Sequence, residues 1–132
     1  MTGAAGLIGR SIAPALAARW DLRLTDLRAD GSVAALDITD LSACREAFAG
    51  VDAVVHLAAV PDPEATWDRL LPANIVGTRN VAQAAMDCGV RRLVLASSLQ
   101  TMSAVPDGLQ ARAQDAPCAR RPKTRSWHGC AA

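Results

Sequence analysis

The chain has 132 residues, which is enough for one domain built around one hydrophobic core. A formal net charge of +1 gives no reason to expect nucleic acid or an anionic membrane as a partner, and an aromatic content of 3% argues against a stacking platform for single-stranded nucleic acid. No run approaches ~18 apolar residues and no signal peptide is recognisable, so we expect no membrane span and a cytoplasmic location. The four cysteines are not paired at C-x-x-C spacing, and we expect no metal site.

The first half of the chain is predicted to contain alternating helices and strands. Apolar residues at helical spacing indicate a helix over residues 7–19. Alternating side chains then predict short strands over 21–26 and 33–38. A helix over 41–49 follows, with Asp40 or Thr39 placed to cap its start and Gly50 placed to end it.

The second half continues this alternation with more apolar elements. Residues 51–59 form a nearly continuous apolar run, which is typical of a parallel strand covered on both faces. A long helix over about 64–88, ended by Gly89, and another buried strand over 92–96 complete the pattern. The helix is predicted to face inward through Leu70, Leu71, Ile75, Val81 and Ala85. Helices that alternate with strands in this way predict right-handed crossovers and a parallel sheet, which is an α/β fold.

The periodic pattern ends soon after Ser98. We therefore expect a folded domain over residues 1–105 and an irregular, disordered tail over residues 106–132, where prolines and arginines are scattered without periodicity. A basic arm that binds nucleic acid is the functional alternative for this tail. The whole chain would then be a basic-tailed interaction protein, the interpretation that we rank last.

Glycines recur at every third position where the first helix begins, at Gly3, Gly6 and Gly9. In a dinucleotide-binding turn, one glycine makes the tight turn, one lets backbone N–H groups approach a pyrophosphate, and one lets the helix pack against the sheet. Asp26 follows the next predicted strand, where a carboxylate can accept hydrogen bonds from the adenosine ribose and repel a 2′-phosphate. Together these features predict an NAD site and disfavour NADP; a solvated Asp at a strand end is the alternative for Asp26 alone.

Six segments that resemble the motifs of one family occur in order along the chain. They are the glycine motif at 2–9, Asp26, Leu36–Ile38, Val55–Ala59, Asn74–Asn80 and Leu95–Ser98. Over residues 1 to about 117 the chain resembles the NAD-dependent epimerase/dehydratase family, the extended branch of the short-chain dehydrogenase/reductase superfamily. The resemblance implies a Rossmann-type, doubly wound parallel sheet that binds NAD and, in a full-length parent, a sugar or sugar nucleotide.

The resemblance also implies roles for individual positions. The glycines would line the pyrophosphate, Asp26 would hold the adenosine ribose, and Asp37 with Ile38 would meet the adenine amino group. Residues 57–59 would run under the cofactor ribose, and Ser97 would lie beside the nicotinamide. Asn74 matches a helix Asn near the family's active site, with a locally bonded helix Asn as the alternative. The positions assigned to the cofactor are Gly3, Gly6, Leu7, Ile8, Gly9, Asp26, Asp37, Ile38, Leu57, Ala58, Ala59, Asn74 and Ser97.

The catalytic part of the resemblance is incomplete. Ser98 resembles the serine whose hydroxyl bonds the reacting substrate oxygen, and His56 is expected to be a packed, hydrogen-bonded histidine rather than a base. The family's chemistry also needs a Tyr and a Lys four residues later, because the ammonium lowers the pKa of the Tyr that moves the proton. The chain contains no Tyr, and its only Lys, Lys123, has Ala119 four positions before it. We therefore expect no catalysis by this chain alone; a frameshifted or truncated gene would produce this pattern.

The segment before the glycine turn is also shorter than the predicted sheet requires. Only Met1 and Thr2 precede Gly3, whereas the glycine turn should follow a strand at the centre of the sheet. We expect an incomplete Rossmann-type domain that lacks this first strand and the carboxyl-terminal part. The expected function is the NAD-binding portion of an NAD-dependent epimerase/dehydratase or sugar/uronate oxidoreductase. The alternative is a non-catalytic, NAD-binding regulatory module of the same superfamily.

Overall fold

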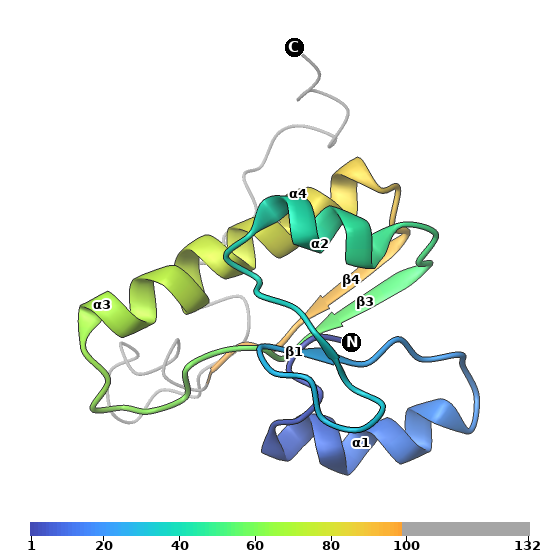
Figure 1. The fold of residues 1–132 in the computed structure, drawn as a ribbon, viewed down its shortest axis with the longest axis horizontal. Coiled ribbons are helices and arrows are strands. Elements are labelled where there is room, and N and C mark those ends of the chain that lie inside the picture. The colour runs from blue at the N-terminus through green and yellow to red at the C-terminus, as the bar shows by residue number, and fades with distance from the viewer. Residues whose placement is uncertain (99–132) are drawn as a thin grey trace, which may run out of the picture. The chain divides into compact units, whose positions relative to one another are not determined.

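Helices and parallel strands alternate along the chain, as Figure 1 shows for the computed structural model. The structure describes residues 1–98, of which Met1–Ala96 form one compact unit. The predicted boundary at residue 105 and the tail over 106–132 lie outside the described residues. The helices are α1 (Leu7–Ala17), α2 (Leu41–Phe48), α3 (Trp67–Leu70), the π-helix η1 (Leu71–Gly77) and α4 (Thr78–Asp87). The strands are β1 (Thr25–Asp26), β2 (Ala34–Ala35), β3 (Ala53–His56) and β4 (Arg92–Leu95).

A parallel sheet joins these strands through Thr2. β1 pairs with β2 and β3 pairs with β4, in both cases in parallel. Thr2 forms parallel bridges to Thr25 in β1 and to His56 in β3, which orders the sheet as β2–β1–Thr2–β3–β4. This order confirms the predicted α/β fold with a parallel sheet. It also places Thr2 between β1 and β3, where the central strand was predicted.

The first two strands are shorter than the sequence pattern predicts. β1 covers two of the residues 21–26, and β2 covers two of the residues 33–38. A strand needs a hydrogen-bonded neighbour as well as alternating side chains. The residues before Thr25 lie beside Met1, and the contact there is a hydrogen bond from the Met1 ammonium group to the Arg23 carbonyl at 2.6 Å, not a strand pair. The alternation therefore indicates which residues can form a strand, and the neighbours decide how many do.

The helix ends follow the predicted caps. At the start of α2, the Asp40 side chain accepts hydrogen bonds from the N–H groups of Ser42 and Ala43. Gly50 and Gly89, which follow α2 and α4, have φ values of 69° and 68°, in the left-handed region that favours glycine. Within residues 1–98, no helix is long and apolar enough to cross a membrane.

The long helix predicted over 64–88 is present as α3, η1 and α4 in succession. Its middle is a π-helix, in which hydrogen bonds span five residues instead of four, so the side chains that follow are rotated relative to a regular α-helix. Val81 and Ala85 are buried as predicted, but Ile75 is 54% exposed. The prediction that Ile75 faces inward is therefore wrong, because it assumed α-helical spacing through the π-helical turn.

The hydrophobic core lies between the sheet and the α2–α4 pair. Figure 1 shows α2 and α4 side by side on one side of β3 and β4, with α1 on the opposite side near β1. The buried core residues are Leu36, Ile38, Cys44, Phe48, Val54, Val81, Ala84 and Ala85. β4 contributes less than predicted, since Val94 and Leu95 are 48% and 46% exposed. The prediction of a buried strand is wrong for this unit because β4 is an edge strand within Met1–Ala96.

Candidate functional site

A tight glycine turn joins Thr2 to α1. Gly3 has a φ of +71°, in the left-handed region that favours glycine. A Cβ atom on Gly3 would lie 2.5 Å from the Ala58 nitrogen, so the missing side chain lets the turn lie directly against the segment after β3. A Cβ atom on Gly9 would collide with the carbonyl oxygen of Gly3. The third glycine therefore lets α1 pack closely onto the turn.

The start of α1 offers open backbone N–H groups. Leu7 and Ile8, the first two residues of α1, are exposed, and their N–H groups donate to no acceptor among residues 1–98. Gly6 is exposed, and a Cβ atom there would have only the Gly3 carbonyl oxygen within 4 Å among residues 1–98. A helix N-terminus carries a partial positive charge, and its open N–H groups bind anions such as a pyrophosphate.

Asp26 lies beside this turn. Its Oδ2 accepts a hydrogen bond from the N–H of Ala5 at 2.9 Å, and its Oδ1 accepts one from the N–H of Leu27 at 2.8 Å. β1 ends at Asp26 and so delivers the carboxylate to the edge of the sheet from which α1 starts. The structure therefore brings together the glycine turn and the carboxylate, as an NAD site requires.

An exposed ion pair lies at the same corner. Arg10 donates through Nε to the Ala5 carbonyl at 2.7 Å, and its guanidinium group pairs with Asp30 at 3.2 Å. Both paired side chains are 66% exposed, so this pair contributes only ~0–1 kcal/mol to stability. Asp30 is thus a second carboxylate near the turn, but one that holds no backbone N–H of the turn.

The Asp37–Thr39 turn follows β2. Asp37 accepts hydrogen bonds through Oδ1 from the N–H and the Oγ1 of Thr39, at 2.9 and 2.7 Å. Ile38 is 7% exposed and belongs to the core, whereas Asp37 is exposed. The carboxylate is therefore presented at the surface while its neighbour anchors the turn. Contact of this pair with adenine stays a prediction.

Residues 57–60 continue from β3 past the glycine turn. The N–H of Leu57 donates to the Thr2 carbonyl at 3.1 Å. Further along, Asn74 of η1 binds the backbone of Val60: its Oδ1 accepts from the Val60 N–H at 2.8 Å, and its Nδ2 donates to the Val60 carbonyl at 3.0 Å. Both ends of the Asn74 amide are thus used within the protein, on a segment 14 residues earlier and not on a neighbouring turn of its own helix. Direct contact between Asn74 and the cofactor stays a prediction.

His56 is a packed histidine, as predicted. It is 4% exposed, and its two ring nitrogens lie 2.6 Å from the hydroxyl oxygen of Thr2 and 3.2 Å from that of Thr78. Burial lowers the pKa of His56 below its ordinary value of 6.5, which favours the neutral ring. His56 therefore connects the start of the glycine turn to the η1–α4 helix.

Ser97 and Ser98 follow Ala96, the first residue after β4, and are exposed. They begin the unit that starts at Ser97, so their predicted places beside the nicotinamide and the substrate stay predictions. Among residues 1–98, no group of three or more His, Cys, Asp or Glu side chains could hold a metal ion.

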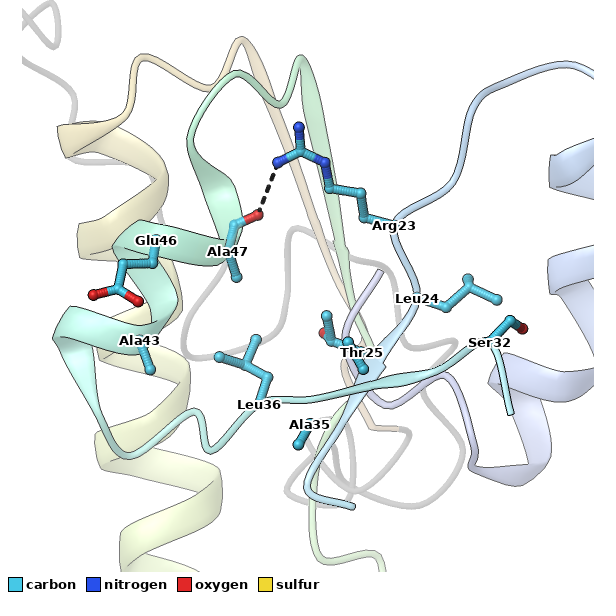
Figure 2. A pocket seen from close by; sticks show the side chains of 10 residues that line it. Arg23, Leu24, Thr25, Ser32, Ala35, Leu36, Ala43, Glu46 and Ala47 are labelled. Atoms are coloured by element: carbon cyan, nitrogen blue, oxygen red, sulfur yellow. Dashed lines mark hydrogen bonds between the residues drawn. The ribbon is translucent and has the colours of Figure 1, made fainter. Parts of the chain in front are cut away.

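A hollow of about 430 Å³ lies between β1, β2 and α2. Figure 2 shows Arg23 extending along one side of it toward Ala47. The guanidinium group donates to the carbonyls of Ala47 and Ala49 at 3.5 and 2.8 Å, which satisfies the carboxyl-terminal end of α2. None of the positions assigned to the cofactor lines this hollow.

Three contributors to the site were not singled out in the sequence: Ala5, Thr78 and Asn80. Ala5 acts through its backbone N–H, which no side-chain pattern reports. Thr78 and Asn80 belong to the Asn74–Asn80 segment that carries the family resemblance, which was the available signal. Their partners lie 22 to 42 residues away, so the sequence did not reveal what they bind.

Comparison with known proteins agrees with this geometry. The model of the NAD dependent epimerase/dehydratase family matches residues 1–131. The chain belongs to this family. L-arabinose 1-dehydrogenase (NAD(P)(+)) of Haloferax volcanii is 46% identical over 100 residues, which cover 74% of this chain and 39% of that protein. The NAD-dependent glucose-6-phosphate dehydrogenase of the same organism is 38% identical over 115 residues, which cover 79% of this chain and 44% of that protein.

Solved structures of relatives share the fold. Uronate dehydrogenase from Agrobacterium tumefaciens, as a point variant complexed with NAD, matches with a TM-score of 0.67 and 35% identity over 76% of this chain and 40% of that one. MoeE5 complexed with UDP-glucose and NAD matches with a TM-score of 0.70 and 27% identity over 83% of this chain and 38% of that one. The chain therefore spans about two fifths of the length of these relatives. It has their Rossmann-type α/β fold and belongs to a family that is described as NAD dependent.

The residues at the glycine turn fit this cofactor. Because Gly3 and Gly9 have no Cβ atom, neighbouring backbone lies where that atom would be, and the turn is tight. The open N–H groups at the start of α1 suit a diphosphate. The Asp26 carboxylate suits the hydroxyls of an unphosphorylated ribose, because it accepts hydrogen bonds from hydroxyl groups and its negative charge repels a phosphate.

Proposed function

We propose that this chain is the NAD-binding portion of an NAD-dependent oxidoreductase or epimerase/dehydratase that acts on a sugar, a sugar nucleotide or a uronate. The observation that carries the proposal is the 2.9 Å hydrogen bond from the Ala5 N–H to the Asp26 Oδ2. It places a carboxylate beside the open N–H groups of α1, which is the arrangement that an adenosine diphosphate without a 2′-phosphate requires.

The residues of this chain bind and orient the cofactor, which when bound supplies the hydride acceptor. The exposed N–H groups of Leu7 and Ile8 bind the pyrophosphate. Asp26 accepts hydrogen bonds from the adenosine ribose hydroxyls and disfavours a 2′-phosphate. The Asp37–Thr39 turn receives the adenine. The close contact between Gly3 and the segment after β3 brings residues 57–59 under the cofactor.

The substrate class in this proposal comes from the relatives, which are named as dehydrogenases of L-arabinose, glucose 6-phosphate and uronate. In a complete protein, the Ser98 hydroxyl would bond the substrate oxygen that loses its proton. The chain has no Tyr to take that proton, and loss of general acid–base catalysis typically costs about 10²–10⁴ in rate. We therefore propose that this chain binds NAD without turning over a sugar by itself.

Calorimetric titration of the 132-residue chain with NAD, ADP-ribose and NADP tests the binding proposal. We expect NAD and ADP-ribose to compete for one site and NADP to bind more weakly. Incubation with NAD and L-arabinose, glucose 6-phosphate or glucuronate should form no NADH. A chain that binds neither NAD nor ADP-ribose refutes the binding proposal, and NADH formation refutes the non-catalytic part.

A non-catalytic regulatory module of the same superfamily is the second candidate, and the absence of Tyr favours it. The nucleotide sequence around codon 118, translated in all frames, distinguishes the two candidates. A Tyr-x-x-x-Lys pair in another frame shows that the chain derives from an enzyme. The lack of such a pair supports the module.

A further inference from the structure

Asn80, at the third position of α4, connects this helix to the turn after β2. Asn80 is 6% exposed, and its Nδ2 donates to the carbonyl of Thr39 at 2.8 Å and to the carbonyl of Ile38 at 3.2 Å. A single side-chain amide thus uses its two N–H groups on two successive carbonyls that lie 41 and 42 residues earlier in the chain. Two carbonyls that point to the same donor fix the orientation of the peptide between them.

The same turn is held by two further contacts on its inner side. A Cβ atom on Gly77, three residues before Asn80, would lie 2.6 Å from Cδ1 of Ile38, so this glycine makes room for the Ile38 side chain against the helix. The Cys44 thiol of α2 lies 3.7 Å from the Ile38 carbonyl. Ile38 is therefore enclosed by α2 and by the η1–α4 helix.

The outer side of the turn carries the carboxylate. Thr39 donates two hydrogen bonds to Asp37 Oδ1, through its N–H and its hydroxyl. Among residues 1–98 these are the hydrogen bonds to the Asp37 carboxylate, both to the same oxygen, and Asp37 is exposed. A series of hydrogen bonds therefore runs from Asn80 to the Thr39 carbonyl, and from Thr39 to the Asp37 carboxylate.

We propose that Asn80 is a positioning residue for the adenine end of the NAD site. By holding the Ile38 and Thr39 carbonyls, it orients the free oxygen of Asp37 toward the 6-amino group of adenine, and so lets the protein distinguish adenine from a base without that group. The proposal rests on the proposed function, in which Asp37 meets the adenine amino group. It assigns recognition of the base to a residue buried in the helix behind the turn.

The test compares two dinucleotides on the full 132-residue chain. NAD has the 6-amino group, and nicotinamide hypoxanthine dinucleotide has a carbonyl oxygen in its place. One hydrogen bond to a carboxylate predicts that the unchanged chain prefers NAD by about tenfold or more. We expect Asn80→Ala to reduce this preference to within about threefold of unity.

The ratio of the two dissociation constants is the deciding measurement. A variant that is only less stable raises the apparent dissociation constants of both dinucleotides by the same factor, because both bind the same folded fraction. The ratio of the two constants is then unchanged. Gln83→Ala is the matched control, since Gln83 lies three residues further along α4 and bonds Asp87 at 2.7 Å instead. It should keep the full preference. If Asn80→Ala yields no folded protein, Asn80→Ser takes its place. Because Ser retains one hydroxyl donor, this variant should lose part of the preference for NAD.

The possible outcomes separate a failure of the proposed NAD binding from a failure of the positioning role of Asn80. An unchanged chain that binds neither dinucleotide refutes the proposed function. An unchanged chain that binds both equally refutes the role of Asp37 and with it the role of Asn80. If the unchanged chain prefers NAD and both Asn80 variants keep that preference in full, NAD binding stands and the positioning role of Asn80 is refuted.

Discussion

Replacing Asp26 by Asn removes one negative charge from the candidate site and keeps the shape of the side chain. In the structure both carboxylate oxygens of Asp26 accept backbone N–H groups, from Ala5 at 2.9 Å and from Leu27 at 2.8 Å. An Asn side chain has a single acceptor oxygen, so one of these N–H groups loses its partner. Leaving a buried group unsatisfied costs ~1–3 kcal/mol, and because this site is only partly buried we expect a loss of about 1 kcal/mol in the free energy of unfolding.

The charge change acts on NAD and NADP in opposite directions. For NAD, the ribose hydroxyls lose a charged acceptor, and a loss of about 1.4 kcal/mol weakens binding about tenfold. For NADP, a 2′-phosphate about 4 Å from the carboxylate is repelled by ~1 kcal/mol in water and ~4 kcal/mol near a protein surface, and the substitution removes this repulsion. We therefore expect Asp26→Asn to narrow the preference for NAD over NADP by about tenfold or more.

Calorimetric titration with both dinucleotides measures this preference, and the narrowing should shrink at high salt because screening weakens the repulsion. Asp30→Asn is the matched control. It also removes one negative charge near the turn, but the Asp30 carboxylate is 66% exposed and pairs only with Arg10 among the described residues. It should leave the preference within about threefold. The reasoning fails if Asp26→Asn keeps the full preference for NAD, or if Asp30→Asn narrows it equally.

Three further outcomes are expected. Gly3→Ala should lower the free energy of unfolding by ~1–3 kcal/mol more than Gly31→Ala in chemical denaturation, because both glycines have positive φ but only Gly3 would bring its new Cβ into the backbone after β3; equal losses would contradict this. Burial holds the folded-state pKa of His56 below 6.5, so the unfolded chain takes up the proton first, and stability should fall as the pH drops from about 7 through that lowered pKa. His56→Gln should flatten this part of the profile, and an unchanged slope would show that other groups cause it. Burial and two nearby aspartates raise the pKa of Cys44 to about 11, so in mass-spectrometric labelling Cys88 should react well before Cys44, and the reverse order would argue against the packing of α2.

Local patterns in the sequence were sufficient for the order of the elements and for much of the candidate site. The caps at Asp40, Gly50 and Gly89 act within one or two turns of their own helices, so the residue type alone predicted them. The glycines at the start of α1 were predictable for the same reason, because a tight turn with positive φ at Gly3 needs a residue without a Cβ. The prediction of Asp26 as their partner needed only the expectation that parallel strands end at the same edge of a sheet.

The amino-acid sequence by itself therefore determined the alternation of helices and strands, the glycine turn and the identity of the candidate NAD residues. Only the tertiary structure decided the length of β1 and β2, the exposure of Ile75 through the π-helical turn, and the bonds of Asn74 and Asn80 to distant backbone groups. The physical reason is the separation along the chain of the residues that interact. Periodicity and capping depend on residues a few positions apart, whereas strand pairing and buried hydrogen bonds depend on which distant segments the packed core brings into contact.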